Sequence, residues 1–158
     1  LSWQNDRLLR LTPLAESDDG KSRITKFARH GQRRAHHKGA LPNHAGWVLD
    51  QESFFKTHDF LHSQAYFSCV TSATKHRQSI KMTLPAGLYL EIIFSGTFCE
   101  NAAKLSKRIE HFLQANDLEP AGNIYILPLE NHWFSCDCEQ YVNKIFLKVE
   151  DKDTTSLT

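Results

Sequence analysis

The stretch LPAGLYLEIIFSGTFCENAAKLSKRIEHF, residues 84–112, carries the clearest structural signal in the chain. Its first half is an apolar run over residues 88–94 that is bounded by glycines, and this pattern predicts a strand. Because alternate side chains of a strand point to opposite faces, one face should pack against a helix. That face consists of Leu88, Leu90, Ile92 and Phe94.

The second half of the same stretch predicts a helix. Thr97 and Glu100 have the spacing of a capping box, in which the two side chains satisfy each other's backbone amides. Asn116 and Pro120 indicate where the helix stops. One apolar stripe with helical spacing runs along it, formed by Ala102, Leu105, Ile109 and Phe112.

Shorter elements are expected on both sides of this unit. Downstream, residues 124–128 and 141–149 are predicted strands, and residues 151–158 form a polar tail. Upstream, strands are expected over residues 22–28, 32–38, 65–72 and 77–84, with a helix from the N-cap Asp50 to about His62. Residues 1–21 are interpreted as a linker or leader stub, whose leucines indicate a short helix before Pro13.

The order of these elements predicts the fold class. Strands outnumber helices, strand and helix do not alternate regularly, and the order of elements indicates two similar halves. We therefore expect an α+β fold with a mostly antiparallel sheet. The expected domain covers residues 22–150.

Length and composition exclude several classes of protein. The 158 residues suit one domain, and 41% hydrophobic residues are typical of a globular protein. Nineteen Lys and Arg against 18 Asp and Glu create no strong field toward DNA or a membrane. The chain has no apolar run long enough to span a membrane, and its first residues are too polar for a secretory signal. Four cysteines are too few for a disulfide scaffold, so free thiols and a cytoplasmic location are expected.

Two further motifs suggest other chemistry. Residues 29–38 are strongly basic, which fits either a nucleic-acid patch or a solvated sheet edge. His132 lies near Cys136 and Cys138, but the C-x-C spacing is poor for zinc, and no metal or cofactor is expected. The chain contains no nucleophile elbow, Walker loop or dinucleotide fingerprint, so the sequence does not predict an enzyme.

Several motifs resemble those of a known family. Residues 84–89 followed by 94–98 are similar to the P-x-G-x-Y … G signature of GyrI-like effector-binding domains. These are the ligand-sensing domains of MerR- and AraC-type bacterial transcription regulators. Residues 46–54 resemble the matching segment of the MerR-type multidrug sensors, and the resemblance covers residues 22–150.

The resemblance implies a duplicated β-α-β-β fold with two helices and a central ligand cleft. Aromatic side chains line that cleft in the family, and a Glu two residues before a strand Tyr serves as counter-ion for cationic ligands. The strand Tyr matches Tyr125, but Asn123 stands where the Glu is expected. Asn offers hydrogen bonds but no negative charge, so this position does not supply the counter-ion of the family.

The candidate ligand-binding residues follow from the strand pattern and the resemblance. Tyr89, Glu91 and Ile93 share the strand face that is turned away from the helix, and Glu91 is either a substitute counter-ion or a solvated residue paired with a lysine. Only one of Tyr66 and Phe67 can face the cleft. The full candidate set is Tyr89, Glu91, Ile93, Asn123, Tyr125, Trp47, Tyr66 and Trp133.

The resemblance implies a cytoplasmic sensor of a small hydrophobic or aromatic molecule, cationic in many members of the family. DNA contact would require a DNA-binding domain absent from these residues, and the full-length protein would be a candidate for homodimer formation. Three alternatives stay open: a stand-alone GyrI-like protein-binding or inhibitor module, a haem carrier, and a hydrolytic relative.

Overall fold

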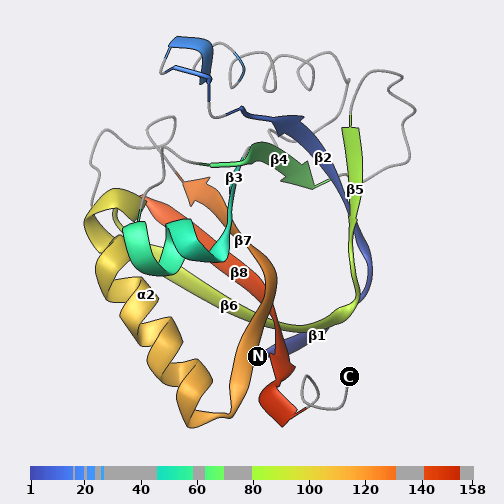
Figure 1. The fold of residues 1–158 in the computed structure, drawn as a ribbon, viewed down its shortest axis with the longest axis vertical. Helices are drawn as coiled ribbons and strands as arrows, with labels where there is room; N and C mark the ends of the chain where they lie inside the picture. Colours follow the sequence, from blue (N-terminus) through green and yellow to red (C-terminus); the bar gives the residue numbers. More distant parts are fainter. Residues whose placement is uncertain are drawn as a thin grey trace.

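In the described part of the chain, eight strands form one antiparallel sheet in the computed structural model. The structure describes residues 1–15, 17–19, 21–23, 26, 46–58, 63–69, 80–130 and 141–153. The strands are β1 (Ser2–Gln4), β2 (Arg7–Pro13), β3 (Gly46–Leu49), β4 (Ala65–Cys69), β5 (Ile80–Leu84), β6 (Gly87–Ser95), β7 (Leu118–Glu130) and β8 (Val142–Asp151). The π-helical turn η1 (Ser53–Thr57) and the helix α2 (Phe98–Ala115) lie on one side of the sheet (Figure 1).

The sheet consists of two halves with the same connectivity. In the second half the chain runs β6, α2, β7, β8, and the strands lie in the order β6-β8-β7. In the first half β2, a helical segment at residues 21–23 and 26, β3 and β4 follow the same path, in the order β2-β4-β3. The halves join where β3 pairs with β7. The expected α+β class and duplicated β-α-β-β architecture are therefore confirmed.

Two long chain segments close the sheet on itself, the segment that contains β1 and β2 and the segment that contains β5 and β6. Gln4 of β1 pairs with Gly87 of β6, and Arg7 of β2 pairs with Leu84 of β5, so one antiparallel register continues across both pairs of strands. Between them the Asp6 carboxylate accepts the backbone N–H of Ala86 at 2.6 Å. Because β2 also pairs with β4 and β6 with β8, the sheet curls and acquires an inner and an outer face (Figure 1).

Each face of the sheet has its own hydrophobic core. The outer core packs η1 and α2 against the sheet, and it contains the predicted helix stripe with Leu105 3% and Ile109 0% exposed. The inner core lies inside the curl of the sheet. We call it the inner cluster: Leu9, Val48, Ala65, Phe67, Leu84, Tyr89, Tyr125 and Phe146.

The prediction for residues 1–21 is wrong over most of its length. Residues 2–13 form β1 and β2 of the sheet rather than a short helix in a leader stub. Leu9 and Leu11 face the inner cluster on alternate positions of β2, which pairs with both β4 and β5. These partners are more than 50 residues away, so the leucines pack as a strand although their spacing also fits a helix.

The strand predicted over residues 22–28 is also wrong where the structure describes it, because residues 21–23 and 26 are helical. Asp19 starts this segment, since its carboxylate accepts the Ser22 N–H at 2.8 Å. Lys26 contacts Asp18 at 2.6 Å, and this hydrogen bond holds the pKa of the Asp18 carboxyl far below its usual range. The basic residues 29–38 lie outside the described residues.

Candidate functional site

Aromatic side chains from both halves meet at the centre of the inner face. Tyr125 and Phe146 pair directly across β7 and β8, and their rings stack with centroids 5.1 Å apart and an interplanar angle of 8°. Phe67 of the first half meets both rings edge-on, at 5.4 Å and 5.9 Å. Tyr89 belongs to the same cluster and is fully buried. The two halves therefore share one aromatic core.

Arg7 adds a positive charge to this aromatic core. Its Cζ atom lies 5.0 Å from the ring centroid of Tyr89 and 4.9 Å from that of Phe146. Both distances are within the range of cation–π attraction, which is strongest where the cation is shielded from water. The guanidinium thus occupies ring faces of the inner cluster.

A second charged group flanks the same rings. Glu91 and Lys144 form an ion pair with 3.2 Å between Oε1 and Nζ, and each side chain is 26% exposed. The Lys144 Nζ atom lies 5.9 Å from the centroid of Phe146. Glu91 is therefore a half-buried carboxylate whose charge is balanced by its neighbour across β6 and β8.

The tyrosines of the inner cluster are held in their neutral form. The Tyr89 hydroxyl donates to the Pro85 carbonyl at 2.7 Å, and burial raises the pKa of Tyr89. Burial also raises the pKa of Tyr125 to about 12, an effect to which the neighbouring Tyr89 adds and which Arg7 opposes. Ionisation of Tyr125 is consequently coupled to unfolding.

We expect Tyr125 to make stability depend on alkaline pH. Its pKa is raised to about 12 in the folded protein, against about 10 in an unfolded chain. The stabilisation that comes from neutral Tyr125 is therefore complete below pH ~10. It is lost as the pH rises toward 12, and the free energy of unfolding falls by about 2 kcal/mol at pH 12. Urea unfolding at several pH values should show a steeper alkaline loss for the native chain than for Tyr125→Phe. Equal slopes would contradict the expectation.

The structure brings only part of the predicted site together. Tyr89 and Tyr125 lie in the inner cluster, and Glu91 lies on the same face beside Lys144. Ile93 continues that face but is 64% exposed. Asn123 donates to the Gln64 side chain at 3.3 Å at an exposed position.

The remaining candidates lie elsewhere. Trp47 packs against the outer core, on the opposite face of β3 from Val48. Tyr66 donates to the carbonyl of Arg23 at 3.1 Å, so Phe67, its neighbour on β4, is the residue that faces the inner cluster. Trp133, together with His132, Cys136 and Cys138, lies outside the described residues.

Sequence patterns do not predict two residues of this core, Phe146 and Arg7. Phe146 has the apolar neighbours Ile145 and Leu147, and it shares its own strand face with Lys144 and Lys148, so the local pattern does not mark that face as buried. Arg7 lies in the stretch that was interpreted as a leader, and no local pattern connects it to Tyr89.

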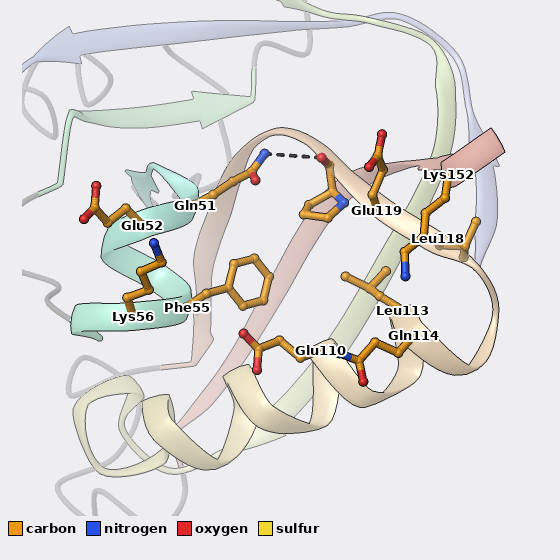
Figure 2. Close-up of a pocket in the computed structure, with 11 residues that line it drawn as sticks. Gln51, Glu52, Phe55, Lys56, Glu110, Leu113, Gln114, Leu118, Glu119 and Lys152 are labelled. Carbon is orange, nitrogen blue, oxygen red and sulfur yellow. Dashed lines mark hydrogen bonds between the residues drawn. The ribbon is translucent and has the colours of Figure 1, made fainter. Parts of the chain in front are cut away.

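A separate groove of about 540 Å³ lies on the outer face between η1, α2 and the start of β7 (Figure 2). The Gln51 amide spans part of it by donating to the carbonyls of Pro120 and Gly122, at 3.3 Å and 3.0 Å. Its lining combines apolar side chains with charges of both signs: Gln51, Glu52, Phe55, Lys56, Glu110, Leu113, Gln114, Leu118, Glu119, Pro120 and Lys152. This groove does not contact the inner aromatic rings.

The part of the chain that the structure describes shows neither a metal site nor a membrane-spanning helix. Its residues contain no group of three or more His, Cys, Asp or Glu side chains placed to hold a metal ion. None of its helices is both long enough and apolar enough to cross a membrane.

Comparison with known proteins identifies the fold. No family description and no curated protein matches the sequence. Among solved structures, the C-terminal domain of EcmrR superposes with a TM-score of 0.66 at 13% identity, covering 95% of each chain. In the EcmrR–DNA complex the matching part spans 56% of the EcmrR chain, with a TM-score of 0.68 and 13% identity over 95% of this chain.

Two further structures share the fold. SAV2435 bound to tetraphenylphosphonium has a TM-score of 0.52 and 13% identity, covering 94% of this chain and 92% of its own. A hydrolase from Listeria innocua has a TM-score of 0.56 and 10% identity, covering 94% and 90%. These likenesses show that the chain has the same fold as the EcmrR C-terminal domain and SAV2435, in agreement with the fold that the resemblance to GyrI-like effector-binding domains implies.

Proposed function

We propose that this chain is the effector-binding domain of a bacterial transcription regulator and that a small aromatic molecule binds on the inner face. The observation that carries the proposal is the aromatic core shared by both halves, in which Phe67 of one half meets Tyr125 and Phe146 of the other. Flat rings with a nearby charge are typical of sites for aromatic ligands. The EcmrR domain and the tetraphenylphosphonium complex of SAV2435 support the same assignment.

The shared core also suggests how binding is transmitted. A ligand that contacts Phe67 and Tyr125 touches both halves, so it favours the arrangement of the halves that it fits best. In a regulator, a DNA-binding domain joined to this one would respond to that shift in population. We extend this proposal to a homodimeric full-length protein whose DNA contacts lie outside these residues.

We propose that the domain binds its ligand without turning it over. On the inner face of the described residues, Glu91 is engaged by Lys144 at 3.2 Å, which leaves it poorly suited to act as a general acid. A hydrolytic function would require product formation that is lost in Glu91→Gln. Ligand recovered unchanged after prolonged incubation supports the binding role.

Titration with aromatic probes of negative, zero and positive charge tests the proposed function. We expect at least one of naphthoate, naphthamide and tetraphenylphosphonium to bind saturably, measured by calorimetry. Tyr125→Leu should weaken that binding by about two- to tenfold, because a stacked ring contributes about 0.5–1.5 kcal/mol beyond its buried area. Phe112→Ala, which alters only the outer core, is the matched control and should bind normally. Absence of saturable binding by all three probes would reject the proposal.

A further inference from the structure

Arg7 presents an unused hydrogen-bonding edge within the inner cluster. Its Nε and Nη2 atoms are buried, and neither has a hydrogen-bond partner among the described residues. These two atoms form one of the two edges with which a guanidinium binds a carboxylate in a bidentate manner. The face of the same group is already used, because it lies over the rings of Tyr89 and Phe146.

The carboxylates nearby are engaged elsewhere. Asp6, the neighbour of Arg7 in the chain, accepts the Ala86 N–H at 2.6 Å. Glu91 pairs with Lys144 at 3.2 Å. No ion pair of Arg7 is found within the described ranges, so no carboxylate of these residues compensates its positive charge. A buried cationic donor without a partner is unfavourable, and an anion that reaches it gains both charge and hydrogen bonds.

The same arrangement disfavours a cationic ligand. A lipophilic cation would be attracted by the ring faces of Tyr89 and Phe146, but the guanidinium already covers them at about 5 Å. It would also meet the like charge of Arg7, whose Nε and Nη2 atoms are buried, and repulsion between like charges is stronger there than in open water. Asn123, at the position of the expected counter-ion, supplies no negative charge.

We propose that the effector of this domain is an aromatic organic anion whose carboxylate is bound by the Nε and Nη2 edge of Arg7. This rests on the proposed function, since it names the ligand class of the same inner face. The planar fork of Arg7 selects a planar carboxylate, and the neighbouring rings select a flat aromatic body. Lys cannot replace Arg fully, because an ammonium group is a point donor without that fork.

The test compares naphthoate with its neutral isostere naphthamide by calorimetry. In the native chain naphthoate should bind at least about tenfold more tightly, the range expected for hydrogen bonds to a charged group. Arg7→Met should abolish this preference while naphthamide binding is retained, and Arg7→Lys should retain part of it. Lys107→Met, which removes an exposed charge from α2, is the control for net charge and should leave the ratio unchanged.

The outcomes separate the two proposals. If naphthamide or tetraphenylphosphonium binds the native chain as tightly as naphthoate, the anion proposal is wrong and the effector-binding function stands. An unchanged ratio in folded Arg7→Met also overturns it, with folding checked by circular dichroism. Should Arg7→Met not fold, the ratio in the native chain decides alone. If no probe binds at all, the proposed function itself fails.

Discussion

Replacement of Phe146 by alanine is expected to lower the free energy of unfolding by about 3 to 5 kcal/mol. Phe146 is 1% exposed and contacts two other rings of the inner cluster, since it stacks on Tyr125 and meets Phe67 edge-on, and the guanidinium of Arg7 lies over its ring. Truncation removes the buried ring and leaves a cavity that a curled, closed sheet cannot collapse to fill. Urea unfolding monitored by circular dichroism measures the loss.

Two variants separate cavity formation from other effects. Phe146→Leu keeps most of the buried volume and should cost less than about 1.5 kcal/mol. Phe112→Ala removes a ring of the same size from a half-buried position on α2, so it should cost clearly less than Phe146→Ala. A loss below about 1 kcal/mol for Phe146→Ala would mean that the inner cluster is not a packed core.

Replacement of Gly46 by alanine is expected to destabilise the protein by about 3 kcal/mol. A Cβ atom at this position would collide with the backbone carbonyl of Ile126 and with the Phe67 ring. Gly46 pairs directly with Phe67 on β4 and lies where β3 joins β7, the seam between the halves. Because the Ile126 carbonyl belongs to the sheet, it cannot move aside cheaply.

A double substitution tests this explanation. In a Phe67→Leu background the ring contact is absent, so Gly46→Ala should cost less than it does in the native chain. The remaining cost then reports the contact with the Ile126 carbonyl. If Gly46→Ala changes the free energy of unfolding by less than about 0.5 kcal/mol, the seam is looser than the structure indicates.

Local patterns account for the second half of the fold. β6 and α2 were predicted from residues 84–112 because alternation, the capping box and the apolar stripe all act over a few residues. Local patterns predict the elements of the first half less accurately. Residues 2–13 are strands because they pair with β4, β5 and β6, and pairing over such separations leaves no local signature.

Sequence patterns likewise predict the position of some candidate site residues and not of others. Strand alternation predicted the inward face of Tyr89, and the family resemblance predicted Tyr125, whereas Trp47 and Tyr66, which were also predicted, lie on the outer side of the sheet. A shift of one residue in register reverses the face of every side chain in a strand, and register depends on the partner strand. Sequence patterns show which residues alternate, and only the assembled sheet shows which set faces inward.

The amino-acid sequence by itself determined the α+β class, the β6–α2 unit and the inward face of Tyr89, because these follow from short-range periodicity and capping. Arg7 precedes Tyr89 by 82 residues in the sequence, and only the tertiary structure shows that its guanidinium lies over the Tyr89 ring. The physical reason is that the closing of the sheet is a long-range event: β2 and β6 approach only when the continuous register between residues 2–11 and 80–89 forms.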